Sequence, residues 1–260
     1  MAPGMADGER LVRVEADPEH GVCRVTLARP AKLNALSDGV RVALQAAVDM
    51  LAGRDDVRVV VLAGEGRAFS AGADLAERVP LPDDPLARRR ASGRWQRLLD
   101  DLERLPQVTV ARLQGHVIGG AALLAAACDL RVAADDVALS IPEVAIGIPL
   151  TWAGLPRLAR EIGLSRTRDL VMTGRRVPAA EAAAWGFLHR VVPAAELDAA
   201  VDMLVGGLVA QPAVPLAMTV DALRALGRAT AAPEVAWADA DILRWSLRDS
   251  AERSSGDASG

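Results

Sequence analysis

Cysteine and histidine are scarce in this chain of 260 residues. It has two cysteines, Cys23 and Cys128, and each lies within an apolar run. We therefore expect buried free thiols rather than a disulfide framework, which fits a reducing cytoplasm. Its three histidines, His20, His116 and His189, are scattered without the spacing of a metal site, so we expect no metal.

Basic surplus and long apolar segments are also missing. The net charge is −4, which gives no reason to expect a nucleic-acid partner. The longest apolar run, residues 117–127, is too short to span a bilayer, and residues 1–10 lack the apolar segment of a signal peptide. We therefore expect a cytoplasmic protein with no membrane partner.

The hydrophobic pattern alternates between strand-like and helix-like segments. Short apolar runs predict strands, and wider apolar spacing predicts helices. The predicted strands are 11–16, 22–27, 57–63, 108–113 and 130–133; the predicted helices are 36–51, 86–104, one from about 119, 157–172, 179–185, 194–210 and 213–228. This order indicates an α/β fold over 11–195 and a helical C-terminal region over 196–249. We expect a flexible tail at 1–10 and a disordered, serine- and glycine-rich tail at 250–260.

Residues 64–75 form a segment of small residues directly after a predicted buried strand. Small residues allow a ligand to approach the backbone closely. Phe69 stands where a dinucleotide fingerprint needs its third glycine, and Ala68 stands where a nucleophile elbow needs its first. Ser70 is therefore a weak candidate for a nucleophile.

Two further segments carry groups that suit chemistry. Gly119 and Gly120 open a helix, where free N–H groups suit an anion or a developing oxyanion, although close helix packing explains them equally well. Glu143 lies within an apolar loop, and desolvation would make it a base near neutral pH. The alternative is a surface glutamate or one at a helix start.

Taken together, these segments resemble the enoyl-CoA hydratase/isomerase (crotonase) family in order and spacing. The resemblance covers roughly residues 10–230, with matching motifs at 29–36, 69–75, 119–129, 142–158 and 173–193. It implies a crotonase-like ββα spiral core and a helical C-terminal region that forms trimers or pairs of trimers. It also implies an acyl-CoA substrate, with coenzyme A as part of the substrate and no tightly bound cofactor.

The resemblance assigns roles to particular residues. The backbone N–H groups of Ala73 and Gly120 should hold the thioester oxygen, with Glu143 as the acid–base. The coenzyme A moiety should lie near Lys32, Leu33, Ala35, Ala71 and Leu75. Asp74 would contact the ligand or fix its own loop, and the remaining site residues should be Ile118, Gly119, Pro142 and Thr151.

One departure from the family pattern bears on the reaction. Hydratases of the family use two glutamates, and Leu123 occupies the first position here. A shift of a double bond needs only one carboxylate, so we expect isomerisation of an enoyl-CoA. A hydratase, a decarboxylase or a non-catalytic acyl-CoA-binding subunit are the alternatives. Trp152 departs from the glycine-rich loop of hydratases, and either an acyl pocket or core packing accounts for it.

The C-terminal end departs as well. The family often ends in a helix with an aromatic residue and a lysine that reach a neighbouring subunit's coenzyme A, and the usual phenylalanine is absent around 245–249. The last contact to coenzyme A is therefore left open.

Overall fold

The computed structural model describes residues 11–77, 83–230, 238–239, 241–242 and 245. The tails expected at 1–10 and 250–260, and most of the divergent C-terminal end, lie outside these residues.

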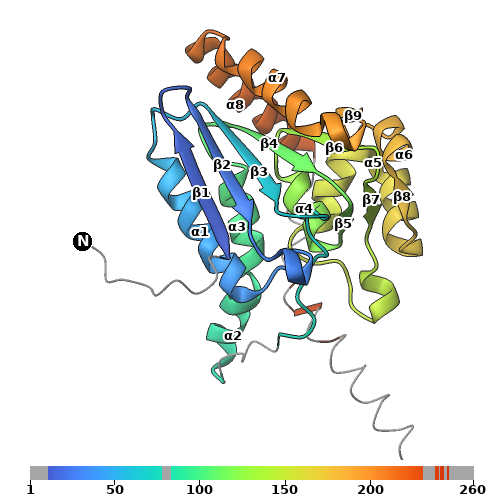
Figure 1. Cartoon of the computed structure of the whole chain (residues 1–260). Coiled ribbons are helices and arrows are strands. Elements are labelled where there is room, and N and C mark those ends of the chain that lie inside the picture. Colours follow the sequence, from blue (N-terminus) through green and yellow to red (C-terminus); the bar gives the residue numbers. More distant parts are fainter. Residues whose placement is uncertain (1–10, 78–82, 231–237, 240, 243–244, 246–260) are drawn as a thin grey trace, which may run out of the picture.

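A six-stranded sheet forms the centre of the molecule (Figure 1). Its order is β1-β2-β3-β4-β6-β9, and only the β1–β2 pair is antiparallel. The strands are β1 (Val12–Asp17), β2 (Val22–Leu27), β3 (Val59–Gly64), β4 (Val108–Leu113), β6 (Leu130–Ala134) and β9 (Arg190–Val192). The predicted α/β fold is confirmed, and the first five of these strands lie within two residues of their predicted bounds.

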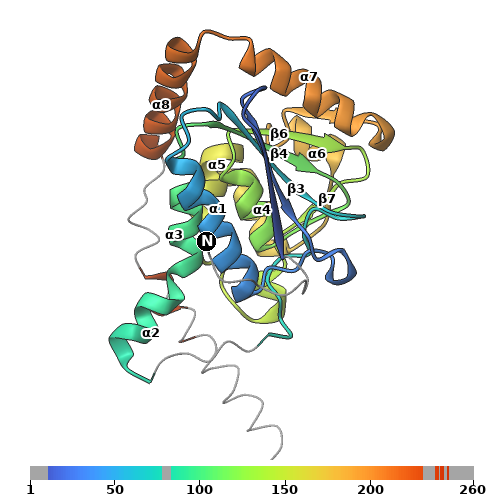
Figure 2. The same cartoon turned by 60° about the vertical axis from the view of Figure 1, so that its left-hand side comes forward.

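Both faces of the sheet are covered, which explains the continuous apolar runs in its strands. In β3, Val60 and Leu62 point into the larger core cluster, whereas Val59 and Val61 point into the smaller one. The larger cluster is closed by α1 (Asp38–Ala52), α3 (Arg94–Leu102), α4 (Gly120–Ala126) and α5 (Gly154–Thr173). The smaller cluster is closed by α7 (Leu197–Val209) and α8 (Ala213–Thr230), which lie across the other face (Figure 2).

A second, smaller sheet was not predicted. It consists of β5 (His116–Ile118), β7 (Ala138–Ser140) and β8 (Val177–Pro178), with β7 in the middle. The apolar run at 117–127 therefore begins as a strand and becomes a helix only at Gly120. This sheet sets the glycine pair beside the turn that follows β7.

The predicted helix over 86–104 is wrong as a single element. Gly93 ends α2 (Pro85–Ser92), and α3 starts directly after it. The later helices begin close to the residues predicted for them. α5 begins at Gly154 instead of 157, and α6 spans Ala179–Ala184 against a predicted 179–185. The helix predicted from 194 begins as a short 3-10 turn, η3 (Ala194–Glu196), which α7 follows. The expected buried, free state of Cys23 and Cys128 is confirmed.

Within the described residues, no single helix has the length and apolar composition needed to cross a membrane. One pair passes that test together, 194–209 with 213–229, and it is bent by 110°.

Candidate active site

The glycine pair lies at the junction of β5 and α4. Gly119 has a φ of +55°, which L side chains rarely adopt, and its N–H donates to Ser140 O at 2.8 Å. A Cβ on Gly119 would lie 2.5 Å from Glu143 Oε1, and one on Gly120 would lie 2.2 Å from Trp152 Cζ3. Both positions therefore need glycine, because a carboxylate and an indole occupy the space of a side chain.

The loop after β3 runs alongside β5 and brings Ala73 to the glycine pair. Ser70 N–H donates to His116 O at 3.0 Å, and Ile118 N–H donates to Ser70 O at 3.3 Å. A Cβ on Gly72 would lie 2.4 Å from Ile118 O and 3.6 Å from Gly120 N. Gly72, the residue before Ala73, therefore packs against the backbone of Ile118 and lies next to Gly120.

The amides of Ala73 and Gly120 are both unpaired within the described residues. Leu36 bonds to the flanking residues of Ala73, accepting from Asp74 N–H at 3.2 Å and donating to Gly72 O at 2.8 Å. In a parallel bridge of this kind the amide of the middle residue points away from the partner. Gly120 is the first residue of α4, where amides have no partner inside the helix. The two segments thus offer two donors side by side.

Glu143 provides a carboxylate beside these donors. It opens the 3-10 turn η2 (Glu143–Ile146), with Pro142 before it and Gly147 ending the turn with a φ of +81°. Its Oε2 is buried and has no hydrogen-bond partner among the residues that the structure describes. Burial raises the pKa of Glu143 above the ordinary glutamate value, and a backbone hydrogen bond opposes this only in part. A desolvated carboxylate with one unpartnered oxygen suits a proton acceptor.

Leu123 and Trp152 complete the surroundings of the glycine pair. Leu123 lies three residues after Gly120 on α4 and is buried. Trp152 stacks on Trp95 of α3, with ring centroids 4.6 Å apart and an interplanar angle of 13°. Trp152 and Ala153 both have positive φ, +61° and +54°. The loop before α5 thus takes a backbone conformation that favours glycine and holds an indole against Gly120.

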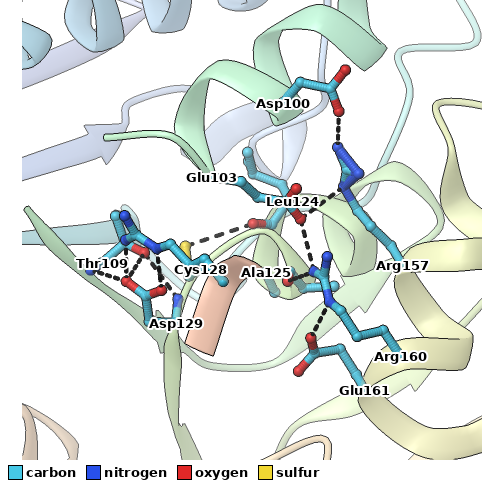
Figure 3. Close-up of polar contacts among 12 residues, drawn as sticks. Asp100, Glu103, Thr109, Leu124, Ala125, Cys128, Asp129, Arg157, Arg160 and Glu161 are labelled. Carbon is cyan, nitrogen blue, oxygen red and sulfur yellow. Dashed lines mark hydrogen bonds and ion pairs between the residues drawn. The ribbon is translucent and has the colours of Figure 1, made fainter. Parts of the chain in front are cut away.

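Ion pairs fix α5 against α3, the helices next to this indole pair. Arg157 donates to Asp100 at 2.6 Å, and Arg160 donates to Glu103 at 2.7 Å. Figure 3 shows the two acidic residues from the α3 side facing the two arginines of α5. Burial raises the pKa of Asp100, and the Arg157 charge opposes that shift. Arg157 is buried and also lies 3.4 Å from Glu103, so loss of both acids would leave an uncompensated buried charge.

The expected coenzyme A residues gather in two neighbouring loops. Parallel strands β2 and β3 end at the same edge of the sheet, so the segments after them lie together. Ala71 N–H donates to Leu33 O at 2.9 Å, and Ala35 N–H donates to Lys32 O at 3.0 Å. Leu75 is 70% exposed. The structure thus brings these residues next to Ala73, and their contact with a ligand stays a prediction.

Three predicted residues have structural partners. Asp74 accepts from Arg29 at 3.0 Å and from Ala76 N–H at 3.3 Å, so it fixes its own loop. Ser70 Oγ donates to Asn34 O and accepts from Gly72 N–H, which gives it a role in the turn. Thr151 O accepts from Gly154 N–H at 3.0 Å; a ligand contact of Thr151 stays a prediction.

Asn34 organises these loops and was missed by the sequence reasoning. It is buried with a φ of +54°. Its Nδ2 donates to Glu65 O and Ala68 O at 2.9 and 2.8 Å, and its Oδ1 accepts from Arg29 N–H at 2.9 Å. The sequence did contain a signal for this role. Asn34 lies between the turn at Pro30 and the N-cap Ser37, and asparagine tolerates the positive φ that a tight turn requires.

The α/β core places two unpaired amides beside a desolvated carboxylate. This arrangement is typical of enzymes that remove a proton next to a carbonyl. Residues 17–256 match the family described as Enoyl-CoA hydratase/isomerase. The chain belongs to this family, whose members act on acyl-CoA thioesters.

Individual relatives agree with this assignment. Over 207 residues the chain is 34% identical to "Probable enoyl-CoA hydratase, mitochondrial" of Dictyostelium discoideum, which covers 77% of this chain and 71% of that protein. Over 193 residues it is 38% identical to "Probable enoyl-CoA hydratase EchA12" of Mycobacterium tuberculosis, covering 72% and 67%.

Solved structures share the fold. An enoyl-CoA hydratase from Mycobacterium avium subsp. paratuberculosis superposes with a TM-score of 0.81 at 29% identity, covering 92% of this chain and 91% of that one. One from Mycobacterium smegmatis gives a TM-score of 0.78 at 32% identity, covering 91% and 90%. The crotonase-like fold with C-terminal helices is therefore confirmed, whereas trimers and the cytoplasmic location stay predictions.

Proposed function

We propose that this protein isomerises enoyl-CoA thioesters, moving a double bond from C3 to C2 with Glu143 as the single acid–base. One observation supports this choice over other reactions of the family. The helix that Gly120 opens, α4, and the turn beside it, η2, contain one carboxylate between them, Glu143, and the Asp74 carboxylate next to Ala73 is engaged by Arg29. Position 123, where a second carboxylate would stand, holds a buried leucine that transfers no proton.

The chemistry follows from this arrangement. Glu143 takes a proton from C2 of a 3-enoyl thioester, and the electron pair moves onto the thioester oxygen. The amides of Ala73 and Gly120 stabilise the resulting dienolate, and each such donor contributes about 3 kcal/mol in comparable sites. The same carboxyl group then returns the proton at C4, which leaves the double bond between C2 and C3. No water enters the balance.

Hydration of a 2-enoyl-CoA is the second candidate, because the relatives above are named as hydratases. Hydration needs a water molecule held and activated near C3. Leu123 and the Trp152 indole place apolar groups next to Gly120, and Asp74, the carboxylate beside Ala73, is paired with Arg29. Isomerisation is therefore the reaction that this set of side chains favours.

Glu143→Gln tests the proposal, since the amide keeps the shape of the side chain but accepts no proton. We expect turnover of a 3-enoyl-CoA to fall by about 10²–10⁴-fold, the usual contribution of a general base, while the Kd for the thioester stays within a few-fold. Glu196→Gln is the matched control, because Glu196 is exposed in η3. Turnover by Glu143→Gln at the wild-type rate would overturn the proposal.

A further inference from the structure

We propose that the stacked pair of Trp152 and Trp95 closes the acyl pocket and restricts this protein to short-chain acyl-CoA substrates. The inference rests on the proposed function, because it takes the Ala73 and Gly120 amides as the place of the thioester oxygen. It adds the class of acyl group that the site accepts.

The Trp152 ring lies directly against Gly120, next to the place of the thioester. Its Cζ3 and Cη2 would lie 2.2 and 2.7 Å from a Cβ on Gly120, so the ring is in van der Waals contact with this backbone. Gly119 on the other side faces the Glu143 carboxylate. An acyl group bound through its carbonyl at Gly120, with C2 near Glu143, therefore meets the indole within a few carbon atoms.

The Trp152 indole is held in place by its neighbours. A ring that swung aside would leave the pocket open, but Trp152 stacks on Trp95, and both rings are half-buried against the core. Aromatic stacking adds about 0.5–1.5 kcal/mol to the burial of the rings in comparable pairs. Asp239 accepts a hydrogen bond from Ala153 N–H at 2.8 Å, which holds the backbone directly after the indole.

The two helices next to the indoles, α3 and α5, are joined by ion pairs. Trp95 is the second residue of α3, and Trp152 lies two residues before α5. The Arg157–Asp100 and Arg160–Glu103 pairs join these helices over a short span (Figure 3). Both indoles are thus mounted on elements that cannot separate without breaking part-buried ion pairs. The wall of the pocket is part of the scaffold and not a mobile lid.

A graded series of substitutions at Trp152 tests whether the stacked indoles limit the length of the acyl group. Trp152→Phe, Trp152→Leu and Trp152→Ala make the side chain at this position progressively smaller. Binding of hexanoyl-CoA and dodecanoyl-CoA is measured by calorimetry, which needs no turnover. We expect wild type to prefer hexanoyl-CoA, and the preference to shift toward dodecanoyl-CoA by about tenfold or more in Trp152→Ala, with Phe and Leu between them.

Trp185→Ala is the matched control, because Trp185, which caps the C-terminal end of α6, is half-buried beneath Arg175 and is not among the nearest neighbours of Gly119 and Gly120. A ratio of the two affinities that stays the same across the series would overturn the inference. Turnover of 3-hexenoyl-CoA and 3-dodecenoyl-CoA is measured in parallel. A shifted ratio without isomerisation would contradict the proposed reaction alone, and isomerisation with an unshifted ratio would contradict the wall alone. Should Trp152→Ala fail to fold, the Phe and Leu variants decide.

Discussion

Oε1 of Glu143 lies 2.5 Å from the point where a Cβ on Gly119 would stand. The carboxylate therefore rests against the backbone of the glycine pair, and its position depends on the absence of one methyl group. Gly119→Ala should move the carboxylate and also strain a φ of +55°. We expect kcat to fall by about 10²-fold from misplacement of the base.

Gly206→Ala is the control for this prediction. No atom of the described part of the chain lies within 4 Å of a Cβ at Gly206, which is an exposed residue inside α7. Alanine there should raise the free energy of unfolding by about 0.5–1 kcal/mol and leave turnover unchanged. Wild-type turnover in Gly119→Ala would show that the glutamate does not act from the position seen here.

The raised pKa of Glu143 predicts a pH-dependent stability cost. Below the ordinary glutamate pKa of about 4.3, the side chain is protonated in both the folded and unfolded states, so the cost is absent. As pH rises through the folded-state pKa, the buried carboxyl ionises unfavourably and stability is lost. The stability that Glu143→Gln gains relative to wild type should therefore increase as the pH rises above about 4.3, measured by urea unfolding at each pH. A stability difference between Glu143→Gln and wild type that stays constant over this range would contradict the shift.

The same ionisation governs activity. Glu143 accepts a proton only as the carboxylate, so kcat/KM should rise with pH through an apparent pKa above the ordinary glutamate value. Initial rates across a pH series give that midpoint for the free enzyme. An acid limb at the ordinary glutamate value would show that the carboxyl is solvated in the working protein.

Asn34 should be a stability determinant of the loops around the site. Asn34→Asp keeps the shape of the side chain and tolerates the positive φ, but it removes the two donors that Glu65 O and Ala68 O accept. We expect a loss of about 2–4 kcal/mol in the free energy of unfolding, because a buried charge replaces two satisfied hydrogen bonds. Gln211→Glu makes the same chemical change at an exposed position and should cost less than about 0.5 kcal/mol. Equal costs for the two variants would rule out this role.

Asp239 should hold the Trp152 loop from the C-terminal side. Burial raises the pKa of Asp239, and the Ala153 amide is its hydrogen-bond donor. Asp239→Ala should lower the free energy of unfolding by about 1–3 kcal/mol and shift the acyl preference in the same direction as Trp152→Ala. Asp241→Ala removes an exposed ion pair with Arg89 and should do neither. An unchanged acyl preference in Asp239→Ala would limit Asp239 to a role in stability.

The sequence predicted the elements with strong periodicity and the segments with unusual chemistry. Glycines at 119 and 120 and a glutamate in an apolar loop are local signals, and the structure brings them together. The short strands β5, β7, β8 and β9 were missed because two or three residues carry no readable period. Gly93 was not read as the end of a helix, since the apolar spacing continues on both sides of it.

Relations between distant residues were beyond the reach of the sequence. The stacking of Trp152 on Trp95 depends on how α3 and α5 pack, and no local pattern encodes it. The positive φ of Trp152 and Ala153 contradicts the preference of both residues, so tertiary packing must impose it. The hydrogen bond between Asp239 and Ala153 joins the C-terminal segment to the site, and no local sequence pattern indicates it either.

The partition between double-bond migration and hydration tests the central claim most directly. Purified protein is given 3-hexenoyl-CoA and, separately, 2-hexenoyl-CoA, and products are separated by chromatography and identified by mass. The account predicts that 3-hexenoyl-CoA is converted to its 2-enoyl isomer with no gain in mass, at a rate well above any gain of water by 2-hexenoyl-CoA, and that Glu143→Gln abolishes the conversion. Faster addition of water to 2-hexenoyl-CoA than migration in 3-hexenoyl-CoA would contradict it.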